Sequence, residues 1–240
     1  MKKIIGLLLL NIVFMTYSYA GFSVIRSSYG ISLDRPKTQE QLITNTGDRD
    51  LQVKIYAAKP TNLVDEKLNM SDWVKVYPRY VTIPAHTSKK VRFIARPPKN
   101  LEAGEYRSVL YYEEVRNEND KRESMGFKLR LGTPIYGRTG NLTYIAEYSD
   151  LKFERSEKGY RLSGVAENTG NTSFTLRAKI KIFDKDGKLL KEADEKEAPL
   201  FRGSKGKIGI ELEEVEKTSK VTVLFYEQNK KHRYEKSFEL

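Results

Sequence analysis

The tripeptide Asn-Thr-Gly occurs twice, at positions 45–47 and 168–170, and an alternating run of apolar and polar residues follows each copy. The first run covers residues 51–55 and the second covers residues 174–182. A period of two is expected of a strand that buries one face, and Asn and Gly tolerate the backbone of tight turns. Each copy therefore predicts a strand–turn–strand unit, and their repetition predicts two domains of the same kind. Independent use of a common turn is the alternative, because Asn and Gly are frequent in turns.

Short alternating segments separated by turn residues continue along both halves of the chain, which predicts an all-β fold of two sandwiches. Helical periodicity is weak and confined to residues 62–74 and 189–200. We place the N-terminal domain at residues 21–138, the linker at 139–143 and the C-terminal domain at 144–240.

The first twenty residues have the features of a secretory signal peptide. Lys2 and Lys3 precede an apolar stretch from Ile4 to Met15, and the small residues Ser18 and Ala20 mark a cleavage site. Cleavage after Ala20 predicts a periplasmic protein with no membrane insertion, whereas a retained single-span anchor is the alternative. The chain contains no Cys, so an exported form must be stabilised by its cores without disulfide bonds.

The chain is basic, with 43 Lys and Arg against 32 Asp and Glu and a net charge of +11. Bases and acids are interspersed, and no block of basic residues typical of nucleic-acid binding occurs. We therefore expect a solvated, Lys-rich surface and no nucleic-acid partner.

Residues with catalytic or metal-binding chemistry are sparse. His86 and His232 are isolated from each other and from any metal-ligand spacing. The acids gather in runs at 192–197 and 211–216, which are typical of solvated strands and loops, and residues 184–187 predict a hairpin turn rather than a calcium loop. We predict no enzyme activity, no metal and no cofactor.

The segment from Ser124 to Arg138 alternates large apolar residues with basic ones. Met125, Phe127, Leu129 and Leu131 share one face of the predicted strand. These side chains either complete the core of their own domain or are offered to a partner, and composition alone leaves both interpretations open.

The order of these features resembles the periplasmic pilus chaperones of the chaperone–usher pathway, in a divergent, non-classical branch. The stretches that carry the resemblance are "NTGDRDLQVKIYA", "WVKVYPRYVTIPAHTSKKVRFIARPP", "LEAGEYRSVLYYEEV", "TPIYGR" and "ENTGNTSFTLRAKIKIFDKDGK". The resemblance implies two tandem immunoglobulin-like β-sandwich domains.

The resemblance also implies a site. In that family the last strand of the first domain lends apolar side chains to a fimbrial subunit that lacks a strand, and two basic residues anchor the subunit's terminal carboxylate. The base of the donor strand here holds Pro134, and the first-strand position falls at Ser28 or Tyr29, so neither supplies a charge. The implied donors are Met125, Phe127, Leu129 and Leu131, and the candidate anchors are Arg26, Arg130 and Arg138.

The predicted function is a periplasmic chaperone that binds and caps pilin-like subunits by donor-strand complementation and delivers them to an outer-membrane usher. A secreted or surface-exposed two-domain immunoglobulin-like adhesion or binding protein is the alternative. An enzyme acting on glycans would require clustered acids or His, which the sequence does not supply.

Overall fold

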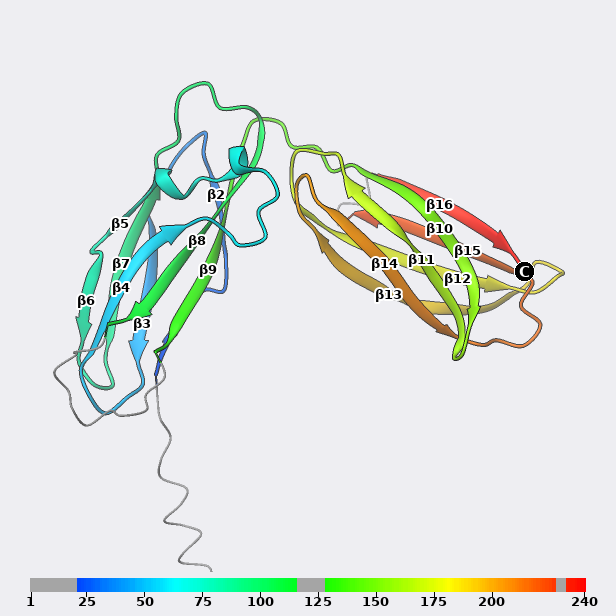
Figure 1. Cartoon of the computed structure of the whole chain (residues 1–240), viewed down its shortest axis with the longest axis horizontal. Coiled ribbons are helices and arrows are strands. Elements are labelled where there is room, and N and C mark those ends of the chain that lie inside the picture. Colours follow the sequence, from blue (N-terminus) through cyan, green and yellow to red (C-terminus); the bar gives the residue numbers. More distant parts are fainter. Residues whose placement is uncertain (1–20, 116–127, 228–231) are drawn as a thin grey trace, which may run out of the picture.

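The computed structural model describes residues 21–115, 128–227 and 232–240, and almost all of its regular structure is β-strand. The predicted signal peptide therefore lies outside the described residues. Figure 1 shows two elongated sandwiches joined by one connection between β9 and β10. The predicted fold class, two tandem immunoglobulin-like β-sandwich domains, is confirmed.

The first domain packs two sheets, with strand orders β1-β3-β7-β5 and β2-β9-β8-β4-β6. Its pairings are antiparallel except β2 with β9. Its elements are β1 (Phe22–Val24), β2 (Tyr29–Ser32), β3 (Gln39–Asn45), β4 (Leu51–Ala58), η1 (Glu66–Leu68), η2 (Ser71–Trp73), β5 (Val74–Tyr77), β6 (Tyr80–Ile83), β7 (Ser88–Ala95), β8 (Gly104–Glu114) and β9 (Arg130–Thr139).

The second domain also packs two sheets, with orders β10-β11-β14 and β13-β12-β15-β16. Its strands are β10 (Ala146–Ser156), β11 (Gly159–Asn168), β12 (Phe174–Phe183), β13 (Leu189–Leu200), β14 (Lys205–Glu213), β15 (Lys220–Glu227) and β16 (Arg233–Glu239).

The two segments with weak helical periodicity do not form α-helices. Residues 62–74 contain the short 3₁₀ turns η1 and η2, whereas residues 189–200 form strand β13. Pairing with β12 on one side supplies the hydrogen bonds of β13, so tertiary pairing overrides the helical preference of its Lys, Glu and Ala residues.

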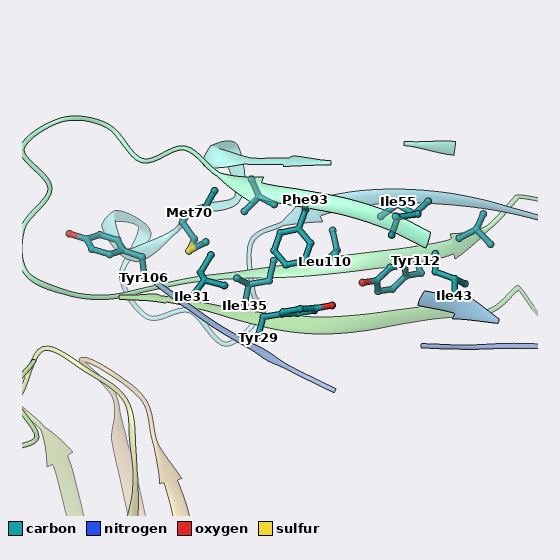
Figure 2. Close-up of a cluster of buried hydrophobic side chains, with 14 of the residues drawn as sticks. Tyr29, Ile31, Ile43, Ile55, Met70, Phe93, Tyr106, Leu110, Tyr112 and Ile135 are labelled. Carbon is teal, nitrogen blue, oxygen red and sulfur yellow. The ribbon is translucent and has the colours of Figure 1, made fainter. Parts of the chain in front are cut away.

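Each domain has its own hydrophobic core. In the first, Tyr29 meets Phe93 edge-to-face with ring centroids 4.8 Å apart, and Leu110 and Ile135 are fully buried beside them (Figure 2). In the second, buried and partly buried residues alternate along all of β12. The period of two seen in the sequence is therefore the period of burial.

The Asn of each Asn-Thr-Gly copy is buried and makes the same bonds in both domains. Asn45 donates through Nδ2 to the carbonyls of Arg49 and Ile83, at 2.7 and 2.9 Å, and accepts from the Gly47 N–H at 2.9 Å. One amide thus closes its own turn and fastens it to the end of β6.

In the second domain, Asn168 donates to the carbonyls of Thr172 and Leu200, at 2.9 and 3.1 Å, and accepts from the Gly170 N–H at 3.0 Å. The turn is thereby fastened to the end of β13. The repeated tripeptide is the anchor of an equivalent corner in each sandwich.

The correspondence extends to a second turn that the sequences do not make obvious. Backbone N–H groups of Asn45 and Asn168 donate to the carbonyls of Thr87 and Ser204, at 2.9 and 3.0 Å. The residues before these acceptors, His86 and Gly203, both have positive φ, 56° and 71°. The segments 83–87 and 200–204 are therefore structural equivalents with little sequence in common.

Replacing either buried Asn by Ala should destabilise its own domain. Asn168→Ala leaves two buried carbonyls without their donor, and Asn45→Ala leaves one buried and one partly buried carbonyl. The cost is about 1–3 kcal/mol for each buried unsatisfied group. Trp73 is the sole tryptophan and lies in the first domain, so its fluorescence in a urea titration should shift for Asn45→Ala and not for Asn168→Ala. Circular dichroism should detect the Asn168→Ala transition, and the exposed neighbour Thr169→Ala is the control. Equal fluorescence midpoints for Asn45→Ala and the native protein would contradict this role.

Candidate functional site

Strand β9 has a partner strand along its whole length on one side and along less than half of its length on the other. It pairs with β8 from Arg130 to Thr139, whereas β2 pairs with it only from Ile135 to Arg138. The edge of β9 from Arg130 to Pro134 therefore has no strand partner among the described residues.

The N-terminal strand leaves this edge uncovered because it is divided between the two sheets. β1 pairs with β3 in the other sheet, and residues 25–28 cross before β2 joins β9. A side-chain bond spans the gap: the Thr133 hydroxyl donates to the Arg26 carbonyl at 3.3 Å. The Ile25 side chain, 70% exposed, lies on this crossing.

Backbone groups face outward at the open edge. The Glu114 N–H donates to the Leu129 carbonyl at 3.0 Å, so odd-numbered residues direct their backbone groups toward β8 and even-numbered ones direct them away. Arg130 and Gly132 thus each present an N–H and a C=O at the open edge. Pro134 presents only a C=O, and an edge is where a strand tolerates proline.

Two of the four implied donor side chains lie in the described residues. Leu129 and Leu131 are partly buried and pack against the core of the first domain. A Cβ on Gly21 would lie 2.9 Å from Leu129 Cδ2, so the start of β1 flanks this side chain. Met125 and Phe127 lie outside the described residues. Leu129 and Leu131 therefore fit both interpretations of this row of side chains. Each one contacts the core of its own domain, and each one keeps exposed surface beside the open edge that a partner could contact.

The three candidate anchors lie in different places. Arg26 is exposed beside the open edge, with its guanidinium 5.3 Å from the Tyr29 ring centroid. Its guanidinium forms no ion pair with any residue that the structure describes. Arg130 lies on the outer face of the sheet, 5.0 Å from the ring centroid of Tyr111. On that face, hydrogen bonds from Lys128 and then from the Tyr56 hydroxyl hold the pKa of Glu113 below its usual value.

Arg138 belongs to the junction between the domains. Its Nε donates to Glu105 Oε2 at 2.9 Å, and the Thr172 hydroxyl of the second domain donates to the same oxygen at 3.3 Å. The Glu105 N–H donates to the Asn171 carbonyl at 2.8 Å, and Arg202 Nη1 donates to the Glu105 carbonyl at 3.1 Å. The three predicted anchors are therefore not brought together.

The structure adds a basic residue that sequence reasoning missed. Arg107 on β8 is only 6% exposed, its Nη2 donates to Asn62 Oδ1 at 3.0 Å, and its guanidinium lies 4.0 Å from the Phe201 ring centroid. Burial lowers the pKa of the Arg107 guanidinium, and the nearby Tyr136 and Glu105 side chains partly offset this decrease. Alternation along β8 predicts that Arg107 lies on the same face as Glu105. The local sequence does not indicate that the second domain packs over this face.

Other site chemistries find little support in the described residues. Residues 21–115, 128–227 and 232–240 contain no group of three or more His, Cys, Asp or Glu side chains that could hold a metal ion. Within the same ranges, no helix has the length and apolar character that crossing a membrane would need.

Comparison with known proteins places the fold. No family model matches the chain, and no curated protein matches it. A chain from the chaperone–tip adhesin complex of CFA/I fimbriae biogenesis is 14% identical, with a TM-score of 0.57, and the match covers 91% of this chain and 98% of that one. The class 5 fimbriae chaperone CfaA is 14% identical, with a TM-score of 0.55 and coverage of 90% and 98%. The YadV chaperone is 12% identical, with a TM-score of 0.50 and coverage of 91% and 99%.

The chain thus shares the fold of these fimbrial chaperones over nearly its whole length. The resemblance predicted from its sequence is confirmed at the level of the fold. The TM-scores show the shared fold, and at sequence identities of 12–14% they show the fold alone.

The contact between the domains can be tested at a position where the two Asn-Thr-Gly copies differ. Asn171 donates through Nδ2 to the carbonyls of Ala103 and Asn141, at 3.2 and 2.9 Å, whereas the equivalent position in the first copy is Asp48. Asn171→Asp removes both donors and should weaken the contact between the domains by about 1 kcal/mol, since the site is exposed. Small-angle X-ray scattering should show a larger radius of gyration, and the mirror change Asp48→Asn should not alter it. Identical scattering from both variants and the native protein would remove Asn171 from the junction.

Proposed function

We propose that the protein is a periplasmic chaperone that binds and caps fimbrial, pilin-like subunits and delivers them to an outer-membrane usher. The open edge of β9 between Arg130 and Pro134, flanked by the partly exposed Leu129 and Leu131, is the observation that carries this proposal. Its position in a fold shared with fimbrial chaperones supports it further. The signal peptide would direct export, and cleavage after Ala20 would release the mature chain. The domain limits at residues 21–138 and 144–240 belong to the same proposal.

Strand addition supplies the binding energy. A subunit segment that pairs with the open edge satisfies the outward N–H and C=O groups of Arg130 and Gly132 and extends the sheet. Apolar side chains of the donor row enter the incomplete core of the subunit. Each fully buried side chain of this size contributes roughly 1.5–3 kcal/mol, so Met125, Phe127, Leu129 and Leu131 together would hold a subunit until transfer.

A basic anchor for the subunit's terminal carboxylate would lie at the side of the open edge. Of the three candidates we favour Arg26, because it is exposed, unpaired among the described residues and bonded through its carbonyl to Thr133. Arg138 is less available, because its guanidinium is committed to Glu105. Arg130 lies over Tyr111 on the outer face.

The backbone part of the proposal is tested by Arg130→Pro. Proline at this position removes an outward N–H and leaves the ladder with β8 intact, as Pro134 already does on the same strand. In co-expression with an exported β-rich protein encoded beside this one, Arg130→Pro should reduce the yield of complex, whereas Arg130→Ala, which also lacks the charge, should retain it. Equal yields from the two variants would exclude strand addition at this edge.

The side-chain part is tested by Phe127→Asp and Leu129→Asp in the same co-expression. A carboxylate in the subunit's core would be buried without a partner, so the complex should be lost. Thermal unfolding of the free variants separates this effect from a loss of fold. A stable variant that still forms the complex would show that this strand is not the donor.

A further inference from the structure

The outer face of the three-stranded sheet β10-β11-β14 in the second domain is hollowed into an open trough. The trough has a volume of about 530 Å³, and its floor includes the small residues Ser163, Gly164 and Gly209. The register places Lys152, Ser163 and Gly209 in one row across the three strands. The feature lies on the second domain, away from the open edge of β9 on the first.

A break in β10 accompanies the trough. The register of β10 with β11 shifts between Ser149 and Lys152, and Asp150 within the shift has a φ of 54°. A bulge of this kind bends its strand and redirects the side chains around it. Lys152 follows the bulge directly and lies at the wall of the trough.

Three cations from three strands surround Ser163. Lys152 comes from β10, Arg161 from β11 and Lys207 from β14, each from a different row of the sheet. Arg161 Nη2 lies 3.7 Å from where a Cβ on Gly209 would be, so the missing side chain leaves room for the guanidinium above the floor.

The charges of this face are unevenly compensated. Lys205 pairs with Glu167 at 2.8 Å, and Arg161 pairs with Glu211 at 3.1 Å. Lys152 and Lys207 form no ion pair with any residue in the described ranges. Asp150 is the acid that lines the trough. Because Glu211 compensates Arg161, the uncompensated positive charge of the lining comes from Lys152 and Lys207.

We propose that this trough binds a phosphate group. A phosphate monoester carries a charge between −1.5 and −2 near neutral pH and three acceptor oxygens, and it matches two ammonium groups and a guanidinium better than a single carboxylate does. The Ser163 side chain lies two residues from Arg161 on β11 and therefore shares its outer face, which adds a hydroxyl at the centre. The group belongs either to a small soluble phosphate or to a phospholipid headgroup.

The first test is a titration of the full chain with inorganic phosphate at constant ionic strength, followed by amide NMR shifts. Saturable shifts should appear in β10, β11 and β14. Lys152→Gln with Lys207→Gln should weaken binding about tenfold or more, since charge-assisted bonds are lost. Lys185→Gln with Lys188→Gln, at the β12–β13 turn, makes the same change of charge and should leave the affinity unchanged. Gly209→Leu should also abolish binding, because it fills the floor without altering any charge.

The second arm distinguishes the source. Co-sedimentation with phosphatidylglycerol vesicles, against phosphatidylcholine vesicles, should depend on Lys152 and Lys207 if the headgroup is the ligand. Binding of inorganic phosphate without vesicle binding supports a soluble phosphate. The proposal is overturned if neither probe binds, or if the trough and control pairs of variants bind both probes equally.

Discussion

The division of the N-terminal strand between two sheets is the constraint on which the candidate site depends. Had residues 22–32 stayed beside β9, they would have covered its edge from one end to the other. Because β1 pairs with β3, β2 can reach only Ile135 to Arg138, and the preceding residues of β9 keep their outward backbone groups. An exposed edge is normally a liability that proteins shorten or block. Its retention beside partly exposed leucines is therefore informative about function.

The two sandwiches share a corner but use it differently. Asn45 and Asn168 make matching bonds, and the turns that receive them match in backbone conformation. In the second domain, this corner also carries Asn171 and Phe201, which contact the first domain. The first domain has Asp48 and Pro84 at these places. The buried Asn amide is kept in both domains and stabilises the corner of each sandwich. The exposed positions beside it differ, and in the second domain they form one side of the junction between the domains.

Sequence patterns predicted the parts of the structure that depend on local periodicity. The alternation after each Asn-Thr-Gly marks strands β4 and β12, and the weak helical segment at 189–200 shows the limit of propensity against strand pairing. The surroundings of the candidate basic residues were less predictable. Alternation along a strand shows which face of the sheet a residue lies on, but not which other part of the chain packs against that face. Arg138 and Arg107 both lie where the second domain covers the first. The sequence of a single strand does not indicate that another domain packs against it.

The two ends of β9 have different surroundings, and the strand connects them. Its ten residues span about 33 Å at ~3.3 Å per residue, with the open edge at the N-terminal end and Arg138 bound to Glu105 at the other. Glu105 Oε1 is buried without a hydrogen-bond partner among the described residues, so this junction is retained although one carboxylate oxygen is left unsatisfied. A partner that adds a strand at the first end is thereby held at a defined distance from the second domain. The orientation of the two domains would then decide which surfaces of a bound subunit meet the second sandwich.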